Sequence, residues 1–144
     1  MGEPVRIYCD GKVVDGQAQI YMVCYDAEGK VMACGENISE ACKNDMAAQY
    51  LAVIDSLESA LAFFSLAEYP VELYLNSKAL VKHLSGKWPV KKKALHKLHQ
   101  RAMAKMSRFR KIKVIFHGEN IVGKVLEEAE TQRQIREAKE RGLE

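Results

Sequence analysis

Two polar residues, Asp10 and Asn76, follow apolar segments that could place them side by side. Asp10 follows residues 5–9, and Asn76 follows residues 71–75 and precedes a basic helical segment. Carboxylates at such strand ends suit hard divalent ions such as Mg²⁺, because these ions prefer anionic oxygen ligands. The amide oxygen of Asn76 carries no full charge and is a weaker ligand. The pair therefore raises the question of whether a metal site can form here.

The charge of the chain is unevenly distributed along the sequence. Residues 73–118 contain 13 of the 22 Lys and Arg residues and none of the 19 Asp and Glu residues. A one-sided block of this kind indicates an anionic partner. The alternative is a solvated helix face that pairs with acidic surface elsewhere. The basic residues are Lys78, Lys82, Lys87, Lys91, Lys92, Lys93, Lys97, Arg101, Lys105, Arg108, Arg110, Lys111 and Lys113.

The remaining composition is that of a globular protein with 144 residues, of which 48% are hydrophobic and 28% charged. No apolar stretch is long enough to span a membrane, and the N-terminus lacks the pattern of a signal peptide. The four cysteines, Cys9, Cys24, Cys34 and Cys42, show no zinc-binding spacing. We therefore expect reduced cysteines and a cytoplasmic location. His96 and His99 lack nearby Cys, Asp or Glu residues and predict no metal site.

Periodicity and turn residues predict the order of the structural elements. Three strands come first, and the first strand is expected to end at the turn-forming pair Asp10-Gly11. A long helix, a fourth strand, two helices, a fifth strand and a last helix follow. The predicted strands are 5–9, 17–25, 31–38, 71–75 and 112–116, and the predicted long helices are 44–67 and 121–141.

The two middle helices are predicted from capping and breaking residues. Asn76 or Ser77 caps a short helix that ends near Leu84, and Gly86 breaks it. Pro89 is expected to open the next helix near its first turn. The apolar face of that helix is predicted to consist of Leu95, Leu98, Ala102, Met103 and Met106.

Four segments in this order resemble the ribonuclease H family. "IYCDG" resembles the first strand of the family with its Asp-Gly pair, and "NDMAAQYLAVIDSL" resembles its first helix. "VELYLNSKALVKHLSGKW" resembles its fourth strand and the helix after it, and "FHGENIVGKVLEEA" resembles its last helix more loosely. The resemblance implies a single α/β domain over residues 1–144 with a charged helical tail at about 127–144. It implies a five-stranded mixed sheet, three antiparallel strands plus two parallel, flanked by helices on both faces.

The resemblance also implies a catalytic centre with four carboxylates. These hold two divalent ions about 4 Å apart, which activate water to cut a phosphodiester. Carried over by position, only Asp10 is retained. Gln49 replaces the helix Glu, and Asn76 replaces the Asp after the fourth strand. Lys124 falls on the last Asp, although a shift of about one turn would place Glu127 there instead.

Losing three of four negative charges argues against a pair of dications, and an inward Lys124 would repel them further. We therefore interpret the site as catalytically inactive and free of metal. In that interpretation Lys124 occupies the space that the ions fill in the family and pairs with Asp10. Loss of its ammonium group is then expected to destabilise the fold.

Other positions match those with which the family contacts nucleic acid. Gly11, Asn44 and Asp45 correspond to backbone contacts, and Lys12, which replaces the usual Ser after Asp-Gly, is counted with them. Asn44 is equally explained as a helix cap. A basic cluster with one aromatic residue corresponds to the region that grips the DNA strand of a hybrid. Trp88 is expected either to stack on a sugar or base, or to pack under a helix. The cluster consists of Lys87, Trp88, Lys91, Lys92 and Lys93.

Three functions remain open from the sequence. The first is an inactive ribonuclease H-like module that binds RNA–DNA hybrid or duplex RNA through its basic helical region, with no cofactor and no membrane partner. The second is a protein-interaction or scaffold domain. The third is an active nuclease that uses Mg²⁺ or Mn²⁺ with an unorthodox ligand set, such as Asp10 with Glu119 or Glu127.

Overall fold

The computed structural model describes residues 3–63, 69–118 and 121–142. Within these ranges the strands and helices follow the predicted order. They are β1 (Val5–Val14), β2 (Gln17–Tyr25), β3 (Val31–Ala41), α1 (Asp45–Phe63), β4 (Pro70–Leu75), α2 (Lys78–Leu84), α3 (Lys93–Met106), β5 (Lys111–Phe116) and α4 (Ile121–Glu140).

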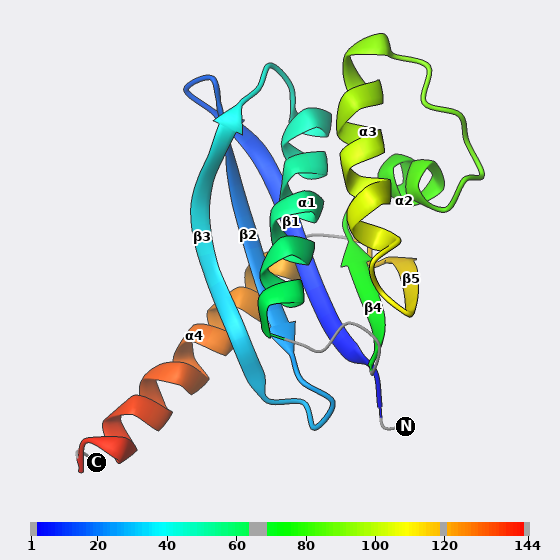
Figure 1. Ribbon diagram of the computed structural model, residues 1–144. Helices are drawn as coiled ribbons and strands as arrows, with labels where there is room; N and C mark the ends of the chain where they lie inside the picture. The colour runs from blue at the N-terminus through cyan, green and yellow to red at the C-terminus, as the bar shows by residue number, and fades with distance from the viewer. Residues whose placement is uncertain (1–2, 64–68, 119–120, 143–144) are drawn as a thin grey trace.

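The strands form one mixed sheet in the order β3-β2-β1-β4-β5 (Figure 1). The pairs β1–β2 and β2–β3 are antiparallel, whereas β1–β4 and β4–β5 are parallel. Short turns join the antiparallel strands, and the parallel strands are reached through helices, as parallel pairing requires. The predicted five-stranded mixed sheet is confirmed.

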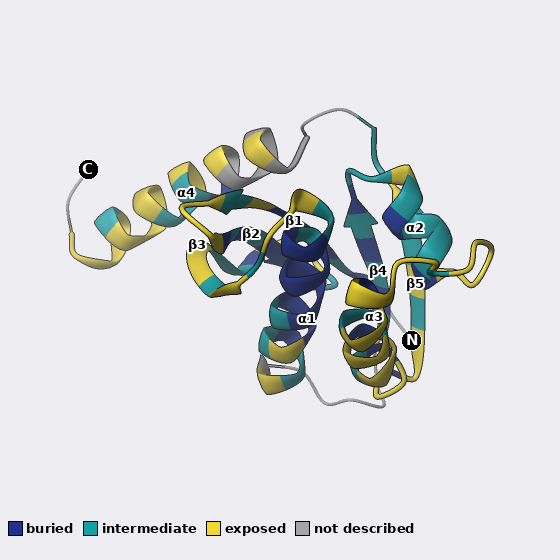
Figure 2. Cartoon of the chain, turned by 90° about the horizontal axis from the view of Figure 1, so that it is seen from above, coloured by how far each residue is buried: buried dark blue, intermediate teal, exposed yellow. Residues whose placement is uncertain are grey.

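Helices cover both faces of the sheet (Figure 2). Residues alternate along β1, so that Val5, Ile7 and Cys9 join the main core with α1, whereas Tyr8 joins a smaller cluster on the opposite face. α3 lies beside α1 on the first face, and α4 crosses β2 and β3 on the second. The arrangement predicted for the helices is therefore confirmed.

α1 supplies most of the main core. Its start is capped by Asn44, whose side-chain oxygen accepts a hydrogen bond of 2.8 Å from the amide of Ala47. The apolar residues recur at helical spacing, and those that face the sheet are fully buried. They include Tyr50, Leu51, Ile54 and Leu57. The predicted end of this helix at residue 67 lies outside the described residues.

α4 extends past the edge of the sheet beyond β3 (Figure 1). Arg133 of this helix pairs with Glu130 at 2.7 Å and with Glu137 at 4.0 Å. Arg133 and Glu130 are half-exposed, and Glu130 also accepts a hydrogen bond of 3.6 Å from the thiol of Cys34 on β3. Pairs of this kind within a helix contribute only a few tenths of a kcal/mol each, about 0.3–0.5. In the described ranges no helix has both the length and the apolar character needed to cross a membrane.

β1 does not end at Asp10-Gly11, so this part of the sequence interpretation was wrong. The strand continues to Val14, with Asp10 opposite Tyr21 and Gly11 opposite Ile20 on β2. The turn follows at Asp15 and Gly16, whose φ values of 51° and 74° suit a tight hairpin. Gly11 serves instead to let α1 approach the strand. A Cβ atom there would lie 2.4 Å from the carbonyl oxygen of Ala48.

The start of α3 and one of its apolar positions also differ from the prediction. The helix begins at Lys93, because residues 89–92 belong to no helix or strand and Lys92, just before the helix, has extended backbone angles (φ −77°, ψ 119°). Leu95, Ala102 and Met106 are buried as predicted, but Met103 is 37% exposed. The apolar stripe is therefore narrower than the sequence pattern indicated.

The four cysteines are free and differ in accessibility. Burial raises the pKa of Cys9 and of Cys24 to about 12, so neither forms the reactive thiolate near neutral pH. Cys34 and Cys42 are only partly buried. We expect a thiol-alkylating reagent to label Cys34 and Cys42 in the native protein and to reach Cys9 and Cys24 only on unfolding. Peptide mass spectrometry over a time course would measure this order, and early labelling of Cys9 would contradict it.

Candidate functional site

Parallel pairing of β1 with β4 brings Asp10 and Asn76 together. Cys9 lies opposite Leu75 in the register, so Asp10, the next residue of β1, and Asn76, the residue after β4, lie side by side where the pairing of these two strands ends. The Nδ2 atom of Asn76 donates a hydrogen bond of 3.2 Å to Oδ2 of Asp10. The amide of Gly11 donates one of 2.9 Å to the other carboxylate oxygen, Oδ1. Both oxygens of Asp10 are thus engaged by donors of the protein itself.

Gln49 belongs to the same neighbourhood through the backbone. Because Gly11 carries no side chain, β1 and α1 touch there, and a Cβ atom at position 11 would lie 3.2 Å from the amide nitrogen of Gln49. Gln49 is half-buried on α1. The structure therefore gathers three of the positions singled out by sequence, Asp10, Gln49 and Asn76, at one end of the central strands.

The fourth position is only partly described. Residue 124 lies in α4, but the side chain of Lys124 is outside the described part of the structure, and so are Glu119 and Asn120. The expected pairing of Lys124 with Asp10 therefore stays a prediction. Glu127, the alternative, is exposed on α4.

The side chains that are described do not fit a pair of divalent ions. Asp10 brings one negative charge, and its two oxygens already accept hydrogen bonds. Asn76 could offer only its Oδ1 atom, which is buried and, within the described residues, has no hydrogen-bond partner. No group of three or more His, Cys, Asp or Glu side chains in those residues could hold a metal ion. One carboxylate cannot balance two dications that lie close together.

Replacing Asn76 by Asp tests this reasoning directly. A second carboxylate about 3 Å from Asp10 repels it and loses the amide donor, so we expect the free energy of unfolding to fall by about 1–2 kcal/mol. Millimolar Mg²⁺ or Mn²⁺ is expected to restore part of the loss, because two carboxylates offer anionic oxygens to one ion. Thermal unfolding with and without the ions measures both effects.

The matched control is Asn76→Ala, which removes the amide without adding charge. It should lose stability without any response to the ions. A marked rise in the unfolding temperature of the unmodified protein on addition of Mg²⁺ or Mn²⁺ would show that the native side chains do hold metal.

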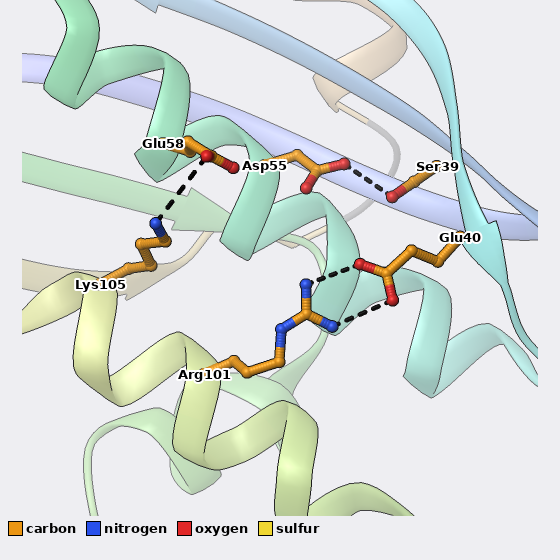
Figure 3. Close-up of polar contacts among 6 residues, drawn as sticks. All are labelled: Ser39, Glu40, Asp55, Glu58, Arg101 and Lys105. Atoms are coloured by element: carbon orange, nitrogen blue, oxygen red, sulfur yellow. Dashed lines mark hydrogen bonds and ion pairs between the residues drawn. The ribbon is translucent and has the colours of Figure 1, made fainter.

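Two parts of the basic block differ in their surroundings. Arg101 and Lys105, on the side of α3 that faces α1 and β3, are paired with acids (Figure 3). Arg101 makes two hydrogen bonds of 3.1 and 2.6 Å to Glu40 on β3, and Lys105 lies 3.9 Å from Glu58 on α1. These two basic residues therefore pair with acidic residues of the protein's own surface, which is the alternative to an anionic partner that the sequence left open.

The second part is the loop between α2 and α3. Lys87, Lys91 and Lys92, with Lys93 at the start of α3, are exposed and form no ion pair with any described residue. Trp88, in the same loop, is 50% exposed. The structure thus brings the predicted cluster Lys87, Trp88, Lys91, Lys92 and Lys93 together on one protruding segment, which we call the basic loop.

The remaining predicted nucleic-acid contacts include Gly11, Lys12 and Asn44, and two of these three have roles in the fold itself. Gly11 is buried between β1 and α1, and the side chain of Asn44 caps α1. Lys12 is exposed, and its ammonium group lies 5.8 Å from the centre of the Tyr21 ring. Of these three, only Lys12 presents a free charged group to solvent. Contacts of any of them with nucleic acid stay a prediction.

Comparison with known proteins identifies the family. Residues 8–122 match the family model described as reverse transcriptase-like. The chain belongs to this family. No curated protein sequence resembles the chain closely enough to count as a match.

Solved structures with the same fold include ribonuclease H domains. The N-terminal RNase H domain of Rv2228c from Mycobacterium tuberculosis is 26% identical, with a TM-score of 0.70 over 81% of this chain and 88% of that one. RNase H1 from Halobacterium salinarum is 23% identical, with a TM-score of 0.75 over 90% and 98%. LC11-RNase H1, solved in complex with RNA/DNA hybrid, is 23% identical, with a TM-score of 0.72 over 90% and 99%. The predicted ribonuclease H-like fold is confirmed.

Proposed function

We propose that this member of the reverse transcriptase-like family is a catalytically inactive module that binds nucleic acid, either RNA–DNA hybrid or duplex RNA, through the basic loop and α3. The observation that carries the binding part is the basic loop, where four lysines and one exposed tryptophan lie together with no acidic partner among the described residues. Lysines of this kind neutralise phosphates of any sequence, and aromatic rings stack on sugars or bases.

The inactivity rests on the contacts of Asp10. Phosphodiester cleavage by two ions needs anionic ligands that keep both ions in place. Here the amide of Asn76 donates to the single carboxylate, and the amide of Gln49 replaces another acid. Of the two candidate ligands we favour RNA–DNA hybrid over duplex RNA, because LC11-RNase H1, which shares the fold, was solved with an RNA/DNA hybrid.

The test is a binding and cleavage experiment with end-labelled RNA–DNA hybrid, duplex RNA and duplex DNA. The protein is titrated at several salt concentrations in Mg²⁺, in Mn²⁺ and in chelator. We expect a shifted complex without cleavage, whose affinity falls with a log–log salt slope of about −0.9 for each phosphate contacted.

Three outcomes would change the proposal. Metal-dependent cleavage that is lost in Asp10→Asn would establish an active nuclease and require substitute ligands such as Glu127. Equal, salt-independent binding to all three duplexes would contradict phosphate recognition by the basic loop. No binding and no cleavage would favour a protein-interaction domain on the same fold.

A further inference from the structure

A pocket of about 520 Å³ lies beside Trp88, and the sequence did not predict it. Its volume is within the range of sites that bind small ligands, about 300–1,000 Å³. The walls are mostly apolar, and three helices contribute one residue each: Met46 in the first turn of α1, His83 in α2, and Leu95 in α3. The other lining residues are Trp88, Pro89, Val90, Lys91 and Lys92 of the basic loop.

The loop is held by its backbone and lines two hollows. The amides of Lys87 and Trp88 donate to the carbonyl of Lys82 at 3.0 and 3.2 Å, and Nε2 of His96 lies 2.6 Å from the carbonyl of Val90. A second hollow of about 370 Å³ shares His83, Trp88, Pro89 and Val90 with the first. Because these bonds fix the main chain, the half-exposed indole of Trp88 is presented beside the pocket and is not enclosed in a core.

The wall formed by α2 is neutral near neutral pH. Nδ1 of His83 lies 3.2 Å from the hydroxyl of Tyr50. Burial raises the pKa of Tyr50 to about 12, so its hydroxyl keeps its proton near neutral pH. Burial, and then the nearby His99, lower the pKa of His83. The neutral ring and the hydroxyl can form their hydrogen bond in either tautomer of His83, so this residue adds a polar but uncharged edge to an otherwise apolar wall.

The rim of the pocket carries the charge. Lys91 and Lys92 belong to the lining, and Lys87 and Lys93 flank it on the same loop. A ligand that fills this site needs a flat, mostly apolar group that stacks on an indole, joined to anions that repeat along a chain. An unpaired nucleotide has this combination, because its base has a π-face and the adjoining phosphodiesters are anionic. An apolar peptide side chain would fill the pocket but would leave the lysines of the rim without partners.

We infer that the pocket beside Trp88 accepts the base of an unpaired nucleotide, while Lys91 and Lys92 bind the phosphates next to it. This inference rests on the proposed function and adds a preference to it. The module binds a duplex best where a single-stranded end or an unpaired base adjoins it. The base pairs of a fully paired duplex leave no base free to enter.

The experiment compares three probes: a blunt RNA–DNA hybrid, the same hybrid with a short single-stranded DNA extension, and one whose extension is abasic. Trp88 is the only tryptophan of the chain, so its fluorescence reports on this site alone. We expect the extension with bases to bind at least about fivefold more tightly than the blunt or abasic probes. The same extension should quench Trp88, whereas the abasic one should not.

Two variants locate the effect. Trp88→Ala should abolish the difference in affinity between the probes, and Val90→Phe should reduce it by filling the pocket while keeping the fluorophore. Ile135→Ala, on the exposed tail of α4, is the control for loss of an exposed apolar side chain and should keep the difference. Circular dichroism checks folding, and Val90→Phe carries the test if Trp88→Ala is not folded.

The outcomes separate this inference from the function on which it rests. Equal affinity for all three probes, with salt-dependent binding of the blunt hybrid, would overturn the base pocket and leave the proposed function in place. If Val90→Phe kept the full difference in affinity between the probes, the base would have to bind somewhere other than this pocket. Absence of binding to every probe would overturn both.

Discussion

Replacement of Lys91, Lys92 and Lys93 together by Gln is expected to lower the affinity for RNA–DNA hybrid on the order of 100-fold near physiological salt. Each of the three ammonium groups is exposed and free of ion pairs with described residues. If each contacts one phosphate, the variant also reduces the log–log salt slope by about 2 to 3. Fluorescence anisotropy at several salt concentrations measures both quantities. The fold should be unaffected, because exposed charges contribute little to stability.

A second triple variant controls for net charge. Lys30, Lys139 and Arg141 are exposed and lie outside the basic block, so their replacement by Gln lowers the formal charge of +3 by the same amount. We expect this variant to lose less than about threefold in affinity, because charges beyond a Debye length of the ligand are screened. Equal losses in the two variants would mean that net charge attracts the nucleic acid and that the basic loop is not its binding surface.

Gly11→Ala is expected to cause the largest loss of stability, about 3 kcal/mol or an unfolding temperature lower by about 10 °C. The added methyl group would lie 2.4 Å from the carbonyl oxygen and 2.7 Å from the carbonyl carbon of Ala48. Both are backbone atoms of α1, so no side-chain movement can relieve the contact, and the helix itself has to shift. Since α1 supplies much of the core, its displacement disturbs many buried contacts. Thermal and urea unfolding measure the change.

Gly118→Ala is the matched control. Among the described residues, a Cβ atom there would meet only the ring of Phe116, at 3.9 Å, which is an ordinary contact distance. The backbone at Gly118 is also outside the positive-φ region, so we expect a change within about 0.5 kcal/mol. If Gly11→Ala were equally mild, the close approach of β1 and α1 would have to be more adaptable than packed backbones usually are.

The order and type of the elements could be predicted because each has a local signal. The alternation in β2 and the three- and four-residue spacing in α1 express the periods of the two structures directly. Parallel pairing of β4 with β1 could also be expected, since a helix lies between them. The family resemblance assigned Asp10 and Asn76 to one site, and their contact confirms that they are neighbours.

The incorrect predictions come from residues whose local preference has more than one use. The pair Asp10-Gly11 is typical of turns, but here the absence of a side chain on Gly11 serves contact with α1. Pro89 suits a first helical turn, yet the segment that it opens is irregular up to Lys92. Met103 has helical spacing with the core residues but lies at the margin of the buried stripe. At Gly11 it is the contact with α1, which is distant along the chain, that decided the outcome.

The sequence by itself determined the fold class, the identity of the residues at the four family positions and the basic character of the segment from 73 to 118. These properties depend on residue type and on spacing along the chain. Only the tertiary structure decided that Asn76 donates to Asp10, that Arg101 and Lys105 face acids while the basic loop does not, and that a pocket lies beside Trp88. The walls of that pocket come from Met46, His83 and Leu95, which are brought together by the packing of α1, α2 and α3. No local pattern encodes such a meeting, because it depends on how whole helices pack on the sheet.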